Sequence, residues 1–562
     1  MDRVIRKKGL TAGEGEIQFP EPIIQRIQSF LTGKEAARSA ILSKSWHSAW
    51  LTRPNLDLDD TYFRKSVDFG FVPIGDFNKY AKNTIRRYEQ SNLKIESFNL
   101  CMDIGELGSS ELAKKLIVKA LKIGATRLCL QINSNSFVLP NAVFRAENLV
   151  ELSVSGCTIK LDDRVVIKCR RLESFSIDFG VRISIDTISK IVSSCPSIEK
   201  LSLLSDFYDK NESMWGVVYE GVEERGQRVD AAAAAAATAM AVGIVDNLIP
   251  RLRCLELGYV WFKTLCLGDL LSRFPLLKDF TLYLNRQSTN RFDTIFEEGI
   301  QISNSSLECI KLLVLERIKN YYIEVRRPRV KFDVPSVRKL TIECAVIPVL
   351  SFMSTPPSRQ WESHVSIQCD DHNKDGFCFS TLWFNKLSEL LTELSRSKTH
   401  LSLKGFYKSS FEYKVGDKII QGLRKHELEN LTIDMTNLAS FSCYAIFDGL
   451  FRLCRPKLIT QYYKDKGRYS HHYRNYSDKE KTKFDFLCRT LEEGINFKVS
   501  RPTQFMYGLN DLEEVNAQTF DMNDILAEWK PIPFESLLDA DAPDEHVQAK
   551  QKIRLLLKWK TS

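Results

Sequence analysis

Residues suited to binding zinc occur together in the middle of the chain. They follow the spacing H-x4-C-x2-H-x5-C, formed by His364, Cys369, His372 and Cys378. Imidazole nitrogens and thiolates are ligands that Zn²⁺ prefers in proteins. The spacing matches no structural zinc pattern, however, and Val365 and Ile367 alternate as they would in a strand. We therefore expect no metal and no cofactor, and we interpret Cys369 as a buried thiol of a repeat core.

A second segment, residues 457–483, mixes cations with aromatic side chains, which can stack on bases or bind phosphates. A solvated loop can have the same composition, and a net charge of +8 over 562 residues is small for a dedicated nucleic-acid binder. We predict that this loop supplements a binding site for another protein: its tyrosines would be the anchors, and its positive charge would favour an acidic or phosphorylated segment. These tyrosines are Tyr462, Tyr463, Tyr469, Tyr473 and Tyr476.

No recognisable catalytic motif is present. The sequence has no GxSxG, no glycine-rich phosphate loop and no HExxH. None of the fourteen cysteines lies in a CxxC pair or has a recognisable catalytic motif around it. We expect a protein that is not an enzyme. An enzyme of unknown type that uses residues 440–562 remains an alternative.

The sequence has no feature that would direct the chain to secretion or into a membrane. The first sixteen residues are charged and contain no apolar core, so we expect no secretory signal. The longest weakly apolar stretch, residues 231–245, is too short and too rich in alanine to span a bilayer. Scattered cysteines indicate reduced thiols. We expect a protein of the nucleus, the cytoplasm or both, without a membrane partner.

The N-terminal sixty residues have the pattern of three short helices. In the first, apolar residues fall on one helical face, with Pro22 in its first turn and Gly33 at its exit. A second helix fits residues 34–40. Ser43 is the expected N-cap of a third helix, whose apolar residues include Trp46 and Trp50. So small a unit cannot bury all these side chains by itself, which favours a protein interface, although a helical cap on the next domain has the same pattern.

These residues resemble the F-box of plant proteins. The family's leading Leu-Pro, its "ILSFL" block and its "LSKRWRxLW" block correspond to residues 19–20, 27–31 and 42–50, and residues 55–59 resemble the plant continuation. Phe19, Thr32, Ser45 and His47 depart from the family pattern. The resemblance implies binding to a Skp-type adaptor and, through it, to a cullin–RING scaffold. It assigns this contact to Phe19, Pro20, Ile23, Ile24, Ile27, Leu31, Trp46 and Trp50.

Downstream, an apolar residue is repeatedly followed by others three and five places on. The nine full copies begin at Ile95, Leu149, Leu172, Ile198, Leu252, Leu277, Leu307, Val337 and Leu428. The last two positions of each triplet alternate as in a short half-buried strand. Copies are commonly two to three dozen residues apart, a period typical of leucine-rich repeats, which stack to cover their apolar faces. Phrases such as "SSCPSIEKLSL" also resemble the repeats of plant F-box proteins.

The expected fold class is α/β: a three-helix F-box followed by a leucine-rich-repeat solenoid with a parallel sheet on its concave face. We expect a disordered segment at 1–15, the F-box at 16–60 and a linker with an N-terminal cap at 61–94. The solenoid would occupy 95–562, with an insertion at about 205–247 and closing repeats after about 440. The family resemblance implies the substrate-recognition subunit of an SCF-type (Skp–cullin–F-box) ubiquitin ligase. The alternative is a repeat scaffold for protein interactions that does not engage a ligase.

Overall fold

The computed structural model describes most of the chain, with gaps. The described ranges are 19–67, 70–73, 76–104, 109–134, 136–162, 164–178, 180–204, 249–258, 264–286, 299–316, 327–354, 361–369, 381–404, 425–434, 447, 449–461, 487–488, 491, 509, 511–521, 530–532 and 551–560. The expected disordered segment at 1–15 and the insertion at 205–247 lie outside these ranges, as do the five tyrosines of residues 462–476. The described residues form two compact units, which meet in the sequence between Ile198 and Glu199.

The first unit begins with three helices, α1 (Glu21–Ser29), α2 (Gly33–Ser39) and α3 (Lys44–Thr52). Five parallel strands follow: β1 (Asn55–Asp59), β4 (Ser97–Asp103), β5 (Arg127–Asn133), β6 (Glu151–Ser155) and β8 (Ser174–Ile177). The connections contain three helices: α4 (Phe77–Gln90), α5 (Ser109–Ile123) and α6 (Ile185–Ser194). They also contain two 3-10 helices, η1 (Asp60–Phe63) and η2 (Val143–Arg145). Two short strand pairs complete them: β2 (Arg64–Val67) with β3 (Gly70–Pro73), and β7 (Thr158–Ile159) with β9 (Arg182–Ile183).

The parallel sheet of this unit starts earlier in the sequence than expected. Asn55 to Asp59 pair in register with Ser97 to Cys101, so β1 is the first strand of the sheet rather than a tail of the helices. The reason is the alternation Leu56, Leu58, which places two leucines on the buried face. The segment before Cys195 is the helix α6, capped at its start by the Ser184 side chain.

The described residues of the second unit include nine parallel strands in one sheet. In spatial order they are β10 (Lys200–Leu203), β11 (Cys254–Gly258), β12 (Asp279–Arg286), β14 (Cys309–Glu316), β16 (Lys339–Cys344), β18 (Glu362–Gln368), β19 (Lys398–Lys404), β21 (Asn430–Ile433) and β23 (Leu458–Gln461). The sheet then continues with antiparallel strands, where β23 pairs with β26 (Gln551–Trp559), β26 with β24 (Leu512–Asp521), and β24 with β25 (Lys530–Ile532).

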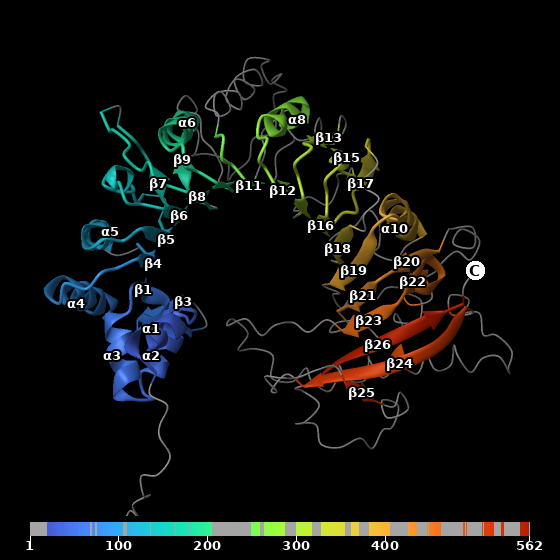
Figure 1. Ribbon diagram of the computed structural model, residues 1–562, viewed down its shortest axis with the longest axis horizontal. Helices are drawn as coiled ribbons and strands as arrows, with labels where there is room; N and C mark the ends of the chain where they lie inside the picture. Colours follow the sequence, from blue (N-terminus) through green and yellow to red (C-terminus); the bar gives the residue numbers. More distant parts are fainter. Residues whose placement is uncertain are drawn as a thin grey trace, which may run out of the picture. The chain divides into compact units, whose positions relative to one another are not determined.

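Smaller elements cover one side of this sheet. They are α8 (Thr264–Ser272), α10 (Thr381–Glu393), a parallel sheet of β13 (Ile300–Ser303), β15 (Arg329–Asp333) and β17 (Val349–Phe352), and the pair β20 (His426–Leu428) and β22 (Cys454–Pro456). In each unit the described helices of the connections lie on one side of the main parallel strands (Figure 1). The fold is therefore mixed α/β with extensive parallel pairing, as expected.

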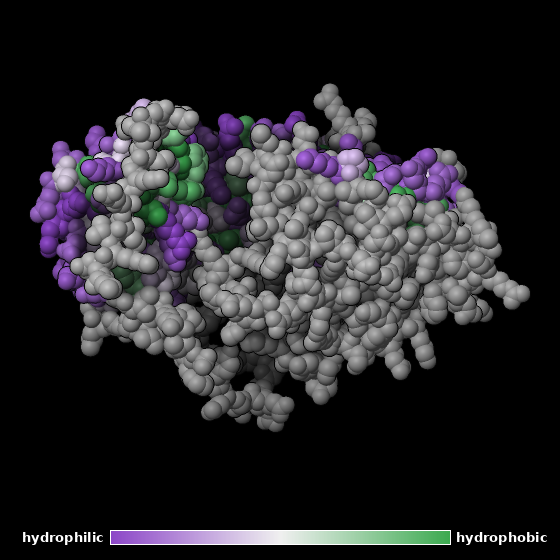
Figure 2. Space-filling model, turned by 90° about the horizontal axis from the view of Figure 1, so that it is seen from below, coloured by the Kyte–Doolittle hydropathy of each residue, from purple (hydrophilic) through white to green (hydrophobic). Residues whose placement is uncertain are grey.

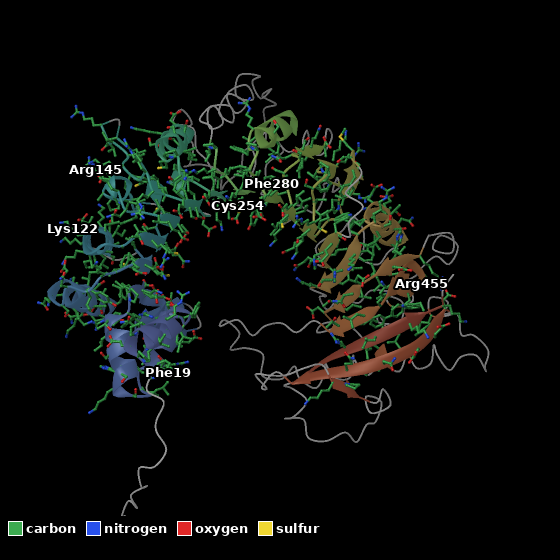
Figure 3. The ribbon with its side chains drawn as sticks, viewed as in Figure 1. Phe19, Lys122, Arg145, Cys254, Phe280 and Arg455 are labelled. Carbon is green, nitrogen blue, oxygen red and sulfur yellow. The ribbon has the colours of Figure 1, made fainter. Side chains whose placement is uncertain are left out.

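The apolar triplets form the cores of both units. Every residue of the nine triplets is buried. In the first unit Phe98, Leu128, Leu152 and Phe175 occupy one cross-strand row, and in the second Leu201, Leu255 and Phe280 form another. Figure 3 labels Phe280 on β12 and Cys254 on the neighbouring β11. Such rows of packed side chains bury apolar surface that a single strand could not cover.

A glycine permits one of the tight connections. Gly156, directly after β6, has a φ of +68°, a conformation that L side chains rarely adopt. A Cβ at this position would also collide with the carbonyl oxygen of Ile132 at the end of β5. Among the described helices, none is long and apolar enough to cross a membrane.

Candidate protein-interaction surface

The three N-terminal helices pack around a small interior. Ile24, Ala36 and Ala49 contribute one buried side chain from each helix. Gln28 is also buried, and its amide nitrogen donates hydrogen bonds to the Ser39 hydroxyl (3.0 Å) and to the carbonyl oxygen of Trp46 (3.1 Å). One side chain of α1 therefore joins all three helices, because buried polar groups need hydrogen-bond partners.

Capping interactions fix where the second and third helices begin. Thr32 and Glu35 form a capping box: the Glu35 carboxylate accepts from the Thr32 backbone N–H (3.0 Å), and the Thr32 hydroxyl accepts from the Glu35 N–H (3.3 Å). Ser43 accepts from the Trp46 N–H, as expected for an N-cap. Thr32 departs from the family pattern, but its side chain caps the start of α2.

Polar contacts attach the helices to one another and to the first strand of the sheet. The Thr52 hydroxyl in α3 donates to the Glu21 carboxylate in α1 (2.6 Å). After α3, the buried Arg53 forms an ion pair with Asp57 of β1 (2.8 Å), and its carbonyl oxygen accepts from the Tyr88 hydroxyl (2.8 Å). The helical segment is therefore joined to the sheet of its unit by buried or half-buried contacts.

A patch of exposed apolar side chains covers part of this helical segment. We call it the apolar patch, and it consists of Phe19, Ile23, Ile27, Phe30, Ile41 and Leu42. The first four lie along one stripe of α1 and its ends, while Ile41 and Leu42 lie in the turn between α2 and α3. Ile41 is 87% exposed and Phe30 is 73% exposed. Figure 2 shows apolar surface bordered by hydrophilic surface in the described part of the first unit.

Not every residue expected at the adaptor contact lies in this patch. Phe19, Pro20, Ile23 and Ile27 are exposed, and Phe19 lies at the end of the helices away from β4 and β5 (Figure 3). Ile24 was expected to contact the adaptor, but its side chain is only 1% exposed. Together with Gln28 it forms the buried side of α1.

The remaining residues of that expectation are half-buried: Leu31, Trp46 and Trp50. Trp50 packs against the rest of the unit, since the Arg87 guanidinium from α4 lies 5.8 Å from the centre of its ring.

Three patch residues were missing from the expected contact: Phe30, Ile41 and Leu42. The signal for Phe30 was its position seven residues after Ile23, on the same face of a helix. Ile41 and Leu42 directly precede the N-cap Ser43, where two apolar residues in a turn have no helical face to pack on. Large apolar side chains at such a site indicate a surface for a partner.

A second candidate surface is the outward face of the strands. In the first unit it carries mostly carboxylates and small polar groups, for example Asp57, Asp59 and Glu151. In the second unit it carries both signs, and neighbouring strands form ion pairs such as Lys311–Glu343 (2.9 Å) and Lys200–Glu256 (3.7 Å). The expected target-binding tyrosines lie outside the described residues and stay a prediction.

Eight of the cysteines that the structure describes have thiols with a raised pKa. A reactive cysteine needs a lowered pKa, because the thiolate is the nucleophile. Burial raises the pKa of the Cys157 thiol to about 12, and burial, followed by the charge of Asp59, raises that of Cys101 to about 12. Burial also raises the thiol pKa of Cys129, Cys169, Cys195, Cys254, Cys309 and Cys454. Thiol catalysis has no support at these eight positions.

His364 and Cys369, two residues of the H-x4-C-x2-H-x5-C spacing, lie on opposite faces of the sheet. Cys369 is buried, as expected for a thiol of the repeat core. His364 instead lies on the outward face of β18, where its ring stacks on that of His400 in β19 with 4.5 Å between centroids. Burial, followed by the charge of His364, lowers the pKa of His400. His372 and Cys378 lie outside the described residues.

Comparison with known proteins finds relatives among plant F-box proteins, while no protein-family model matches the chain. A putative FBD-associated F-box protein of Arabidopsis thaliana is 29% identical over 199 residues, which are 34% of this chain and 40% of that protein. An F-box/LRR-repeat protein of the same plant is 28% identical over 210 residues, covering 36% of this chain and 53% of the relative. A further F-box/LRR-repeat protein is 30% identical over 192 residues, covering 33% and 48%.

The chain therefore spans about half the length of the curated relatives that it matches. The relatives carry both features that the residues led us to expect, the F-box and the leucine-rich repeat, in their names. The chain is thus a relative of the plant F-box/LRR-repeat proteins.

Proposed function

We propose that the chain is the substrate-recognition subunit of an SCF-type ubiquitin ligase. Its α1–α3 segment would be the F-box and would bind a Skp-type adaptor, which joins it to a cullin–RING scaffold. The observation that carries the proposal is the apolar patch: six large apolar side chains exposed within Phe19–Leu42. The segment already has a buried interior, and these six side chains are not part of it.

The patch has the composition of a protein interface core. Aromatic and aliphatic anchors dominate interface energetics, and fully burying one such side chain contributes about 1.5–3 kcal/mol. The hydrogen bonds of Gln28 and the capping box of Thr32 hold the helices in place before binding. Such preorganisation lowers the entropy that is lost on association.

Charge around the patch favours an acidic partner. Arg26, Lys34, Arg38 and Lys44 are exposed on the same three helices. The Arg26 guanidinium also lies 4.8 Å from the centre of the Phe30 ring, so it borders the patch directly. Complementary charge steers association and makes it sensitive to salt.

The strands would form a leucine-rich-repeat solenoid that holds the target protein. The support is the repeated parallel strand with a buried triplet and an outward row of polar and charged side chains. Repeat arrays present extended, rigid surfaces of this kind. The chain itself would catalyse no reaction; by holding the target on the same scaffold as a ubiquitin-loaded enzyme it raises their effective concentration. We place this activity in the nucleus, the cytoplasm or both.

The test is capture of a purified Skp-type adaptor by the full chain. The triple variant Ile23→Ala, Ile27→Ala, Phe30→Ala removes three exposed anchors from one stripe and leaves Ile24 and Gln28 intact. We expect its affinity to fall at least about tenfold, since about 1.4 kcal/mol corresponds to a factor of ten. Circular dichroism should be unchanged.

The matched control removes exposed apolar side chains elsewhere in the same unit. Val138→Ala with Val166→Ala fits this purpose, because both side chains are exposed and neither lies on α1–α3. The control variant should bind the adaptor like the wild type. Equal capture by the triple variant and the wild type would overturn the proposed adaptor contact, and no capture by the wild type would favour the scaffold alternative.

A further inference from the structure

Three residues of metal-ligating types, one glutamate and two histidines, meet on the outward face of two neighbouring strands. His364 of β18 and His400 of β19 are direct partners in the parallel register. Glu362 lies two residues before His364, and since side chains alternate along a strand it is on the same face. Glu362 is exposed and both histidines are half-buried, so solvent reaches all three.

The donor atoms are close to the separations that a metal requires. The Glu362 Oε2 atom lies 3.4 Å from the His364 Nε2 atom. One donor atom from each of the three residues lies within 4.8 Å of the other two. Metal–ligand bonds of about 2.0–2.1 Å in a tetrahedron place donor atoms about 3.3 Å apart. One edge of such a tetrahedron is therefore present, and a tilt of the His400 ring, now 6° from parallel to His364, would bring the third donor closer.

The backbone beneath these side chains is held in register. On the opposite, buried face, the hydroxyl of Ser363 donates to that of Thr399 (3.1 Å), and these two residues are again direct partners in the strand pair. Rigid strands position ligands more precisely than loops do. The tilt thus involves side-chain torsions and leaves the strands in place.

Charged residues beside the cluster affect how strongly it would bind a dication. Lys339 and Lys398 are the register partners of Glu362 on either side, and their charges oppose a dication. The Glu362 carboxylate supplies the opposite charge and an oxygen ligand. Thr341 and Asn430, the neighbours of the histidines in the same row, are uncharged.

We propose that Glu362, His364 and His400 form a site for a divalent transition-metal ion, with Zn²⁺ as the preferred ion. Two imidazoles and a carboxylate suit this borderline ion, and three protein ligands leave a coordination position open to water or to a donor from a bound protein. The ion would link β18 to β19 on the outward face. This site does not depend on the adaptor contact proposed above.

The test is calorimetric titration of the full chain with Zn²⁺, together with Co²⁺ absorption in the visible range. The double variant His364→Ala, His400→Ala should bind one Zn²⁺ fewer and lose the Co²⁺ band of this site. Glu362→Gln should weaken the same site at least about tenfold, because even changes to the partners of metal ligands typically cost 10–100-fold in affinity.

The control is His47→Ala, which removes an exposed histidine on α3. It should bind the same number of Zn²⁺ ions as the wild type, and circular dichroism should show that all variants are folded. Unchanged Zn²⁺ stoichiometry and affinity in the folded double variant would overturn the proposal. A visible Co²⁺ spectrum that the double variant retains in full would overturn it as well.

Discussion

The N-terminal helices and the parallel strands use apolar side chains in opposite ways. Every residue of the nine strand triplets is buried. Within Phe19–Leu42, by contrast, Ile24 is buried while its neighbour Ile23 is exposed. Both regions have apolar residues at regular spacing, so the spacing by itself does not separate packing from binding. What separates them is the size of the interior: the strands bury one face in a core that continues from strand to strand, whereas three short helices have too small an interior to bury all their apolar side chains.

The largest difference should appear when phenylalanine is truncated in each region. Phe175→Ala in β8 removes a fully buried ring from a row that includes Leu152. We expect a loss of about 3–5 kcal/mol in the free energy of unfolding. Phe30→Ala removes a ring that is mostly exposed and should change this free energy by less than about 0.5 kcal/mol. Urea unfolding followed by circular dichroism measures both, and equal losses would contradict the contrast between the two regions.

A smaller effect is expected for the polar side chain inside the helical segment. Gln28→Ala removes the donor that serves Ser39 and the carbonyl oxygen of Trp46. Leaving buried groups without partners costs about 1–3 kcal/mol, so we expect a loss in that range, confined to α1–α3. Gln25→Ala is the matched control, since Gln25 is only half-buried. Hydrogen exchange of the three helices reports the loss, and similar exchange in both variants would count against a structural role for Gln28.

A smaller loss than that of Gln28→Ala, and one that depends on pH, should come from an ion cluster in the second unit. The Asp511 carboxylate accepts from Lys425 (2.5 Å) and Arg455 (2.6 Å). The hydrogen bond from Lys425, with that from Arg455, lowers the pKa of Asp511. A lowered folded-state pKa means that the stabilisation is complete above the ordinary aspartate value of about 3.9 and is lost as pH falls through the folded-state value.

Asp511→Asn should therefore cost at most about 1 kcal/mol at pH 7, because the pair is partly exposed and screened by solvent. The cost should fall toward zero once the pH is below the folded-state pKa. Urea unfolding at a series of pH values checks this, and a cost that persists unchanged in strong acid would show that the ion pairs are not its origin.

Much of the architecture was determined by the sequence by itself. Apolar spacing predicted the strand triplets, and Ser43 predicted the start of α3, because local periodicity and capping depend on near neighbours in the chain. The residues of the N-terminal segment also predicted the relationship to plant F-box proteins, which the relatives confirm. By contrast, residues 55–59 were assigned to the helical segment: the alternation of Leu56 and Leu58 is short, and the pairing of β1 with β4 spans about forty residues.

Only the tertiary structure decided which apolar side chains of the helices face outward. Ile23 and Ile24 are adjacent and chemically identical, and their roles differ because α2 and α3 cover one side of α1 and not the other. The same holds for His364, which shares a zinc-type spacing with Cys369 in the sequence, although we expected no metal there. Adjacent parallel strands instead place it against His400, thirty-six residues later, because side chains in a strand alternate between faces and Cys369 points to the core.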